Sequence, residues 1–221
     1  MPRRDAPPES RLGSRQPGLW ELEACAAWDT ALDAYPDALE ASGGGKLRAL
    51  DRWYHLQWPA DVRARQPLAV TRDELLQVIR WKMGRGVWRE RNLRLAETNQ
   101  AADVARCTEA ALAAVPDMRR PLDSIASLRG VGVATASAVL AALYPAHYPF
   151  LDDVVGAQVP ELGAPAFTMK YYLAYAAALR DRATQLSRQC THREWTAHAV
   201  GLALWSAASA AERGHDPGGA S

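Results

Sequence analysis

The sequence predicts an all-α fold built as a single multi-helix domain. Alanine and leucine dominate, and runs of valine, isoleucine and threonine in period-two alternation are missing, which argues against β-sheets. Of the 221 residues 48% are hydrophobic, and the formal net charge is only +1. Such a chain has enough apolar surface to bury, and its charge is too balanced for disorder throughout. Its length suits one domain.

The two ends of the chain differ in composition from the middle. Residues 1–18 are rich in proline, arginine, serine and glycine and have no apolar period, and the residues from about Gly214 onward are similar. We therefore predict a disordered leader over 1–18, an all-helical domain over 19–213 and a flexible tail over 214–221.

Proline, glycine and capping residues divide the first half of the domain into helices. Tyr35-Pro36 closes the first helix, and the glycines after Ser42 form a flexible break. Thr71 and Glu74 form a capping-box pattern, and apolar residues follow it at helical spacing as far as Gly84. The predicted helices are 20–34, 46–58, 71–83, 89–97 and 101–115.

The second half begins with a short predicted helix over 122–127. A glycine-containing turn, 128–132, leads into a helix whose apolar face ends before Pro145. A long helix is expected over 169–187. Thr191 and Glu194 repeat the capping-box pattern, which predicts that the last helix starts there.

The composition also indicates in which part of the cell the protein is expected. The longest apolar stretches fall short of the ~20 residues that span a bilayer, and the amino terminus lacks the apolar core of a signal peptide. Cys25, Cys107 and Cys190 are odd in number and far apart, a pattern that fits buried free thiols better than a disulfide framework. We expect a protein of the nucleus or cytoplasm, not secreted and not in contact with a membrane.

The turn around Gly130 and Gly132 has the composition of a phosphate-binding element. Two glycines around Val131 let the backbone turn tightly at a helix N-terminus, where free N–H groups and the helix dipole attract an anion. Thr135 can add a hydroxyl group in the first turn. The alternative is that the glycines only close a tight turn between two core helices.

The same stretch resembles the hairpin of helix-hairpin-helix proteins. The matching positions are Leu128, Gly130, Val131, Gly132, Thr135, Ala136, Val139 and Leu140. The resemblance covers residues 122–144 and implies DNA as the partner, with the backbone held regardless of sequence. It also implies a monovalent cation, in some members, on the hairpin carbonyls. The residues that it places at DNA are Arg129, Gly130, Val131, Gly132, Ala134 and Thr135.

The hairpin is also similar to that of the endonuclease III-like (HhH-GPD) DNA glycosylase superfamily of base excision repair. In these enzymes an aspartate follows the last hairpin glycine by about twenty residues, which here falls on Asp152. A one-residue shift in the preceding loop makes Asp153 the match. Such a carboxylate can stabilise an oxocarbenium-like sugar or orient the attacking water. The alternative is that the aspartate only caps a short helix beginning near Val154.

Two features of that superfamily are missing. Its bifunctional members carry a Schiff-base lysine two residues after the last hairpin glycine, where this chain has Ala134. Lys170 is the only lysine after the hairpin, and Lys46 and Lys82 lie far upstream, so the resemblance implies a monofunctional glycosylase. Four closely spaced cysteines are also missing, and His192 and His198 have no partners at ligand spacing. We therefore expect neither an iron–sulfur cluster nor zinc.

Residues 80–94 concentrate positive charge. They hold six basic residues, one acidic residue and two tryptophans, Trp81 and Trp88. A basic strip with aromatic residues suits a phosphate backbone and stacking on a base, so Lys82, Arg85 and Arg89 are candidate DNA contacts. The alternative is a solvated helix face with both tryptophans in the core. The segment also resembles one in uncharacterised eukaryotic proteins that carry the same hairpin, which assigns no chemistry.

Two functions remain open on the sequence. The first is a monofunctional, glycosylase-like enzyme that holds DNA at the hairpin and uses Asp152 or Asp153 to cleave the glycosidic bond. The second is a DNA-binding module that keeps the scaffold without the chemistry. No counterpart of the superfamily's polar, glutamine-containing helix is evident in the first half of the chain, which favours the second.

Overall fold

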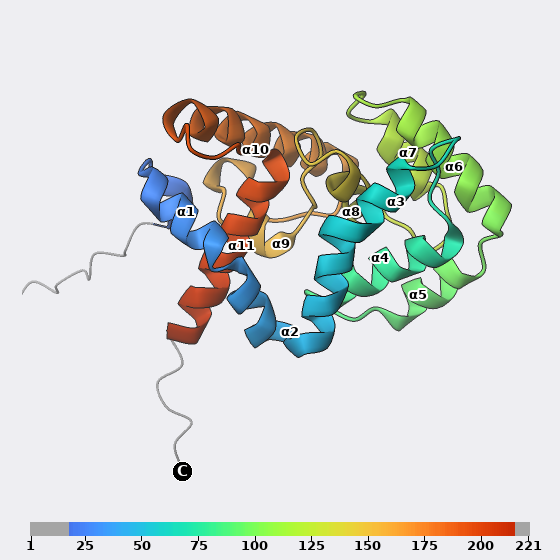
Figure 1. Cartoon of the computed structure of the whole chain (residues 1–221), viewed down its shortest axis with the longest axis horizontal. Coiled ribbons are helices and arrows are strands. Elements are labelled where there is room, and N and C mark those ends of the chain that lie inside the picture. Colours follow the sequence, from blue (N-terminus) through green and yellow to red (C-terminus); the bar gives the residue numbers. More distant parts are fainter. Residues whose placement is uncertain (1–17, 215–221) are drawn as a thin grey trace, which may run out of the picture.

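Helices make up all the regular secondary structure in residues 18–214, the part of the chain that the computed structural model describes (Figure 1). The prediction of an all-α fold is therefore confirmed. The predicted disordered leader (1–18) and flexible tail (214–221) lie outside the described part, except for Gly18 and Gly214. None of the helices in the described part is long and apolar enough to cross a bilayer.

The amino-terminal elements are η1 (Leu19–Glu21), α1 (Cys25–Asp33), α2 (Tyr35–Arg52), the π-helical turn η2 (Trp53–Gln57) and α3 (Trp58–Arg63). Tyr35-Pro36 separates two helices as predicted, but it also begins α2, because proline is tolerated in a first helical turn. The predicted glycine break is a kink within α2 at Gly44, which has a φ of 65°. The helical path then continues past Trp58, since Pro59 lies in the first turn of α3.

The middle of the chain forms α4 (Arg72–Gly84), α5 (Glu90–Glu97), α6 (Ala101–Ala113), α7 (Arg120–Ala126) and α8 (Val133–Leu143). The capping box that starts α4 is present. The backbone N–H of Glu74 donates to the Thr71 hydroxyl oxygen (3.3 Å), and the backbone N–H of Thr71 donates to the Glu74 carboxylate (2.8 Å).

The last elements are α9 (Asp153–Gly156), η3 (Pro160–Leu162), α10 (Met169–Gln189) and α11 (Ala197–Gly214). The predicted start of the last helix at Thr191 is wrong. The Ser187 hydroxyl group bonds both the backbone N–H and the carbonyl oxygen of Trp195, which holds this segment outside the helix. The Thr196 hydroxyl oxygen then accepts from the backbone N–H of Ala199 in the first turn of α11 (3.1 Å).

Helix α8 lies at the centre of the core. Ten of its residues, from Ala134 to Leu143, are buried, and it packs against α7 and α4. The Tyr54 ring stacks on the Trp81 ring with centroids 3.5 Å apart, and its hydroxyl group donates to the Ala138 carbonyl oxygen (2.5 Å). These contacts join η2 to the middle of α8 and to the carboxyl half of α4.

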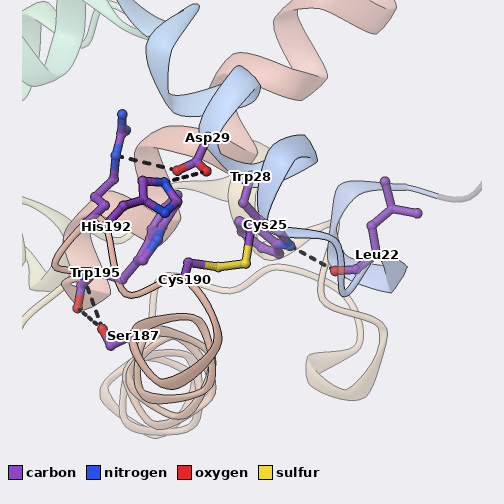
Figure 2. The surroundings of a disulfide bond; sticks show 9 residues. Leu22, Cys25, Trp28, Asp29, Ser187, Cys190, His192 and Trp195 are labelled. Atoms are coloured by element: carbon purple, nitrogen blue, oxygen red, sulfur yellow. Dashed lines mark hydrogen bonds and ion pairs between the residues drawn. A yellow bond between two sulfur atoms is a disulfide. The ribbon is translucent and has the colours of Figure 1, made fainter.

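A disulfide joins Cys25 in α1 to Cys190 after α10 (Figure 2). The prediction of free thiols is therefore wrong for these two cysteines, while Cys107 is a buried free thiol. Both α1 and α10 pack against α11, and this arrangement brings together residues 165 positions apart in the sequence. Beside the disulfide, the Trp28 indole N–H donates to the Leu22 carbonyl oxygen (2.8 Å).

Candidate nucleic-acid interface

The turn between α7 and α8 requires a glycine at position 130. Gly130 has a φ of 74°, in the left-handed region that L side chains rarely adopt. A Cβ atom there would lie 2.3 Å from the Asn92 carbonyl oxygen and 2.6 Å from the Ala96 nitrogen. Both contacts belong to α5, so the absence of a side chain lets the turn pack directly on the backbone of that helix.

Asn99 fixes the other side of the same turn. Its side-chain oxygen accepts from the backbone N–H of Arg129, and its side-chain nitrogen donates to the Arg129 carbonyl oxygen, both at 2.9 Å. Asn99 was not among the residues predicted from the sequence. No local pattern marks an asparagine thirty residues before the turn it holds.

The residue just before α8 is open to solvent. Gly132 is exposed and extended (φ −107°), and no atom lies within 4 Å of the position that its Cβ would occupy. The amides of Val133 and Ala134 belong to the first helical turn and have no acceptor within the helix. The side chains of Val131, Ala134 and Thr135 are buried, so the candidate contacts at these positions come from the backbone, together with the exposed side chain of Arg129.

Residues 80–94 divide between the core and the surface. Trp81 is fully buried, whereas Trp88 is 52% exposed. The Trp88 indole N–H donates to one Glu90 carboxylate oxygen (2.9 Å), and the other oxygen accepts from Arg94 (3.1 Å). The alternative that puts both tryptophans in the core therefore holds for Trp81 and is wrong for Trp88.

The two predicted DNA-binding segments meet in space. Gly130 packs on α5. One exposed arginine of the other segment, Arg80, lies on α4, and the other three lie on α5 or just before it. These are Arg89, Arg91 and Arg94. The exposed start of α8, Arg129, the arginines of α5 and Trp88 will be called the basic surface.

A pocket of about 190 Å³ lies at one end of this surface. It is lined by the candidate residues Lys82, Arg85, Arg89, Asp152 and Asp153. Its apolar wall contains Phe150, Phe167 and Val87, of which Phe167 and Val87 are exposed. The pocket thus combines two groups of residues that lie about sixty positions apart in the sequence.

Asp152 is held inside the protein. One carboxylate oxygen accepts from the backbone N–H groups of Val154 (2.9 Å) and Val155 (3.4 Å) and so caps α9. The other oxygen lies 3.5 Å from an Arg85 nitrogen. Burial raises the pKa of Asp152, and the positive charge of Arg85 opposes this effect. Asp152 therefore caps α9, while Asp153 is exposed, and both line the pocket.

Arg85 is buried among aromatic rings. Only 2% of its side chain is exposed, and the guanidinium carbon lies within 6 Å of four ring centroids. These belong to Trp205 (4.6 Å), Trp81 (5.2 Å), Phe150 (5.4 Å) and Tyr35 (5.6 Å). Cation–π attraction stabilises the charge there. In this arrangement Arg85 holds Asp152 and does not extend into solvent.

Lys82 lies in the last turn of α4 and is half-buried. Burial and the positive charge of Arg89 lower the pKa of its amine, and the carboxylates of Asp152 and Asp153 oppose that shift. The pocket therefore brings together an amine and an exposed carboxylate that belong to different parts of the chain.

Comparison of this chain with protein-family models, with curated proteins and with solved structures finds no match. We therefore infer the function from the geometry of the site and from the resemblance of the hairpin motif.

Proposed function

We propose that the protein binds the backbone of duplex DNA through a helix-hairpin-helix formed by α7, the turn at 128–132 and α8. The observation that supports this proposal most is the packing of Gly130 on α5, because the turn before α8 thereby adjoins the helix that carries the exposed Arg91 and Arg94. The backbone N–H groups and the arginines offer donors and positive charge to phosphates.

Contacts of this kind carry no sequence information, so binding is expected to depend on salt and little on sequence. Each phosphate neutralised by the protein releases condensed counterions, which makes the affinity fall as salt rises. Fluorescence anisotropy with two duplexes of unrelated sequence, at several salt concentrations, measures both properties. Equal weak binding at all salt concentrations, or no binding at low salt, would contradict the proposal.

Gly132→Val is the matched variant for this test. The extended backbone and the open space at Gly132 accommodate a side chain without strain, so the free energy of unfolding should change little. The new side chain lies beside the open amides of α8 and should weaken DNA binding about tenfold. Gly130→Ala is the structural control. It should lower stability, because its Cβ would collide with α5.

A second candidate function, monofunctional release of a base from DNA, is favoured by the pocket. An exposed carboxylate and apolar walls in one cavity suit an extruded nucleoside, and a carboxylate can assist water in breaking the glycosidic bond. Because Asp152 caps α9, this role falls to Asp153.

Base release from damaged duplexes, with Asp153→Asn beside the wild type, tests the second candidate. Activity that falls by orders of magnitude in Asp153→Asn supports it. Release that is absent in the wild type, or unchanged in Asp153→Asn, leaves DNA binding as the function.

A further inference from the structure

The disulfide between Cys25 and Cys190 joins two sulfur atoms in unlike surroundings (Figure 2). Cys190 is only 1% exposed, whereas Cys25 is partly exposed. A reagent in solution therefore has access to the side chain of Cys25 and almost none to that of Cys190. Cys107, the third cysteine of the chain, is a buried free thiol.

The two bonded cysteines also lie at opposite ends of their helices. Cys25 is the first residue of α1, whose N-cap residue, Ala24, forms no side-chain hydrogen bond and whose first turn holds no acidic residue. The partial positive charge at this helix end favours a thiolate. Cys190 is the C-cap residue of α10, where the partial negative charge of the helix end disfavours a thiolate. In the reduced protein the negative charge therefore belongs on the Cys25 sulfur.

Asp29, one helical turn after Cys25, is already paired. Residues four apart lie on the same face of a helix, so an unpaired carboxylate there would repel a thiolate. One carboxylate oxygen of Asp29 lies 2.8 Å from the His192 Nε2 atom, and the other lies 3.5 Å from the Arg193 Nε atom. These contacts reduce the repulsion, so Asp29 does not cancel the effect of the helix end.

Other contacts hold the two segments together without the disulfide. Trp28 of α1 is fully buried. In α10, the Nη2 atom of Arg182 donates to the Trp20 carbonyl oxygen (2.8 Å), and its guanidinium carbon lies 4.5 Å from the Trp20 ring centroid. The Nη2 atom of Arg193 donates to the Asp33 carboxylate (2.7 Å). We therefore expect reduction to leave the fold intact and the two sulfur atoms close enough to rejoin.

We propose that Cys25 and Cys190 form a reversible redox site, in which the Cys25 thiolate reacts with hydrogen peroxide and Cys190 converts the product into the disulfide. The proposal is independent of DNA binding. It rests on the asymmetry of the pair, because one sulfur is accessible at the positive end of a helix and its partner is enclosed beside it.

The reaction balances with the peroxide as oxidant. The Cys25 thiolate attacks one peroxide oxygen, the oxygen–oxygen bond breaks, and the hydroxide that leaves takes up a proton to become water, so that Cys25 becomes a sulfenic acid. The Cys190 sulfur then gives up its proton and attacks the Cys25 sulfur, and the hydroxyl group leaves with that proton as a second water. A dithiol such as dithiothreitol restores both thiols by two exchange steps, the first at the accessible Cys25 sulfur.

Alkylation of the wild type tests the asymmetry of the pair. The full chain is reduced with dithiothreitol without denaturant, freed of reductant and exposed briefly to iodoacetamide, and peptide mapping gives the rate at each cysteine. We expect Cys25 to react at least about tenfold faster than Cys190 and Cys107. Equal rates, or a disulfide that is reduced only after unfolding in urea, would overturn the proposal and leave a purely structural cross-link.

Hydrogen peroxide tests the oxidation step. One equivalent should restore the disulfide in the reduced wild type. In Cys190→Ser the sulfenic acid has no partner, so dimedone, which reacts with sulfenic acids, should label Cys25. Cys107→Ser is the matched control and should re-form the disulfide as the wild type does.

The outcomes that contradict the redox site are distinct from these. A dimedone label on Cys107 instead of Cys25, or a peroxide that leaves both thiols of the reduced pair free, overturns it. Circular dichroism checks that each variant is folded. The alkylation rates of the wild type decide the proposal if Cys190→Ser does not fold, because they require no substitution.

Discussion

The guanidinium group of Arg85 lies 3.5 Å from the carboxylate of Asp152, and both side chains are almost fully buried. Two backbone N–H groups of α9 bind the same carboxylate. Asp152 therefore compensates an internal charge and caps a helix, and its neighbour Asp153 remains free to face the pocket. The two adjacent aspartates have different roles because only one of them points into the core.

Replacing Asp152 by asparagine should destabilise the protein. The asparagine oxygen can still cap α9, but the negative charge opposite Arg85 is lost. Removal of one partner from a buried ion pair costs about 3 kcal/mol, because the other charge stays uncompensated. Urea denaturation measures this cost as a lower free energy of unfolding.

Asp153→Asn is the control for that experiment. Asp153 is exposed, and substitutions at such positions change stability by about 0.5 kcal/mol or less. Equal stability of the two variants would show that the pair of Arg85 and Asp152 contributes nothing to folding.

The disulfide between Cys25 and Cys190 should contribute strongly to stability. It closes a loop of 165 residues, for which the loss of chain entropy in the unfolded state corresponds to about 5 kcal/mol. Thermal unfolding of the wild type with and without dithiothreitol is expected to show a lower midpoint in the reduced protein. In the Cys25→Ser/Cys190→Ser double variant the reductant should have no effect. A wild-type midpoint that does not respond to reductant would contradict this prediction.

A buried chain of polar groups connects α2, η2 and α11. The Asp51 carboxylate lies 3.1 Å from the His55 Nδ1 atom, and the Nε2 atoms of His55 and His198 are 3.1 Å apart. Burial, together with the charges of His55 and Arg85, lowers the pKa of His198 well below its ordinary value. Burial alone would raise the pKa of Asp51, but hydrogen bonds from His55, Tyr35 and Trp81 outweigh it and lower that pKa to about 2.

These shifts predict that stability falls with decreasing pH in two ranges. Below about pH 6.5 the unfolded chain protonates His198 while the folded protein does not. Below about pH 4 the unfolded chain also protonates Asp51, and this contribution is lost as the pH falls toward 2. Each group contributes a slope of at most about 1.4 kcal/mol per pH unit.

Urea denaturation at several pH values checks this prediction. His198→Gln keeps a hydrogen-bonding side chain that does not titrate, so its stability should depend less on pH between 7 and 5. Asp123→Asn is a control, because Asp123 pairs with Arg119 on the surface and has no histidine partner among the ion pairs of the described residues. A variant at His198 with the wild-type pH dependence would remove this histidine as the cause.

Local signals in the sequence predicted most of the helices, and long-range contacts account for what it missed. The capping box at Thr71 operates within one helical turn, so it could be read from four residues. The same pattern at Thr191 failed because hydrogen bonds between Ser187 and Trp195 hold that segment outside a helix. These hydrogen bonds depend on how α10 and α11 pack, and the local capping-box pattern carries no information about that packing.

In the candidate site, too, local sequence signals predicted some features, and long-range contacts account for the others. The glycine turn was evident from its spacing, whereas the hydrogen bonds between Asn99 and Arg129 depend on the packing of this turn against α5. Sequence distance also placed Lys82 outside any site with the aspartates, and the packing of α4 brings them to one pocket. Likewise the disulfide depends on the meeting of α1 and α10 at α11.

Trp88 provides the last prediction. Its ring is half-exposed among arginines, and the contact with Glu90, itself bound by Arg94, fixes the indole N–H. An ordered aromatic side chain in a basic setting suits stacking on an unpaired base, which contributes about 1–3 kcal/mol per base. We therefore expect the protein to bind DNA that contains a single-base bulge or a single-stranded segment more tightly than a continuous duplex.

Trp88→Ala should weaken binding to bulged DNA about tenfold and leave binding to a continuous duplex nearly unchanged. Trp88→Phe should retain much of the preference, because the ring is kept and only the indole N–H is lost. Leu56→Ala removes another exposed apolar side chain, one that does not line the pocket, and so serves as the matched control. Anisotropy with the two DNA forms at one salt concentration measures the ratio of affinities. If Trp88→Ala lowers both affinities by the same factor, the ring contributes to general DNA contact without stacking on an unpaired base.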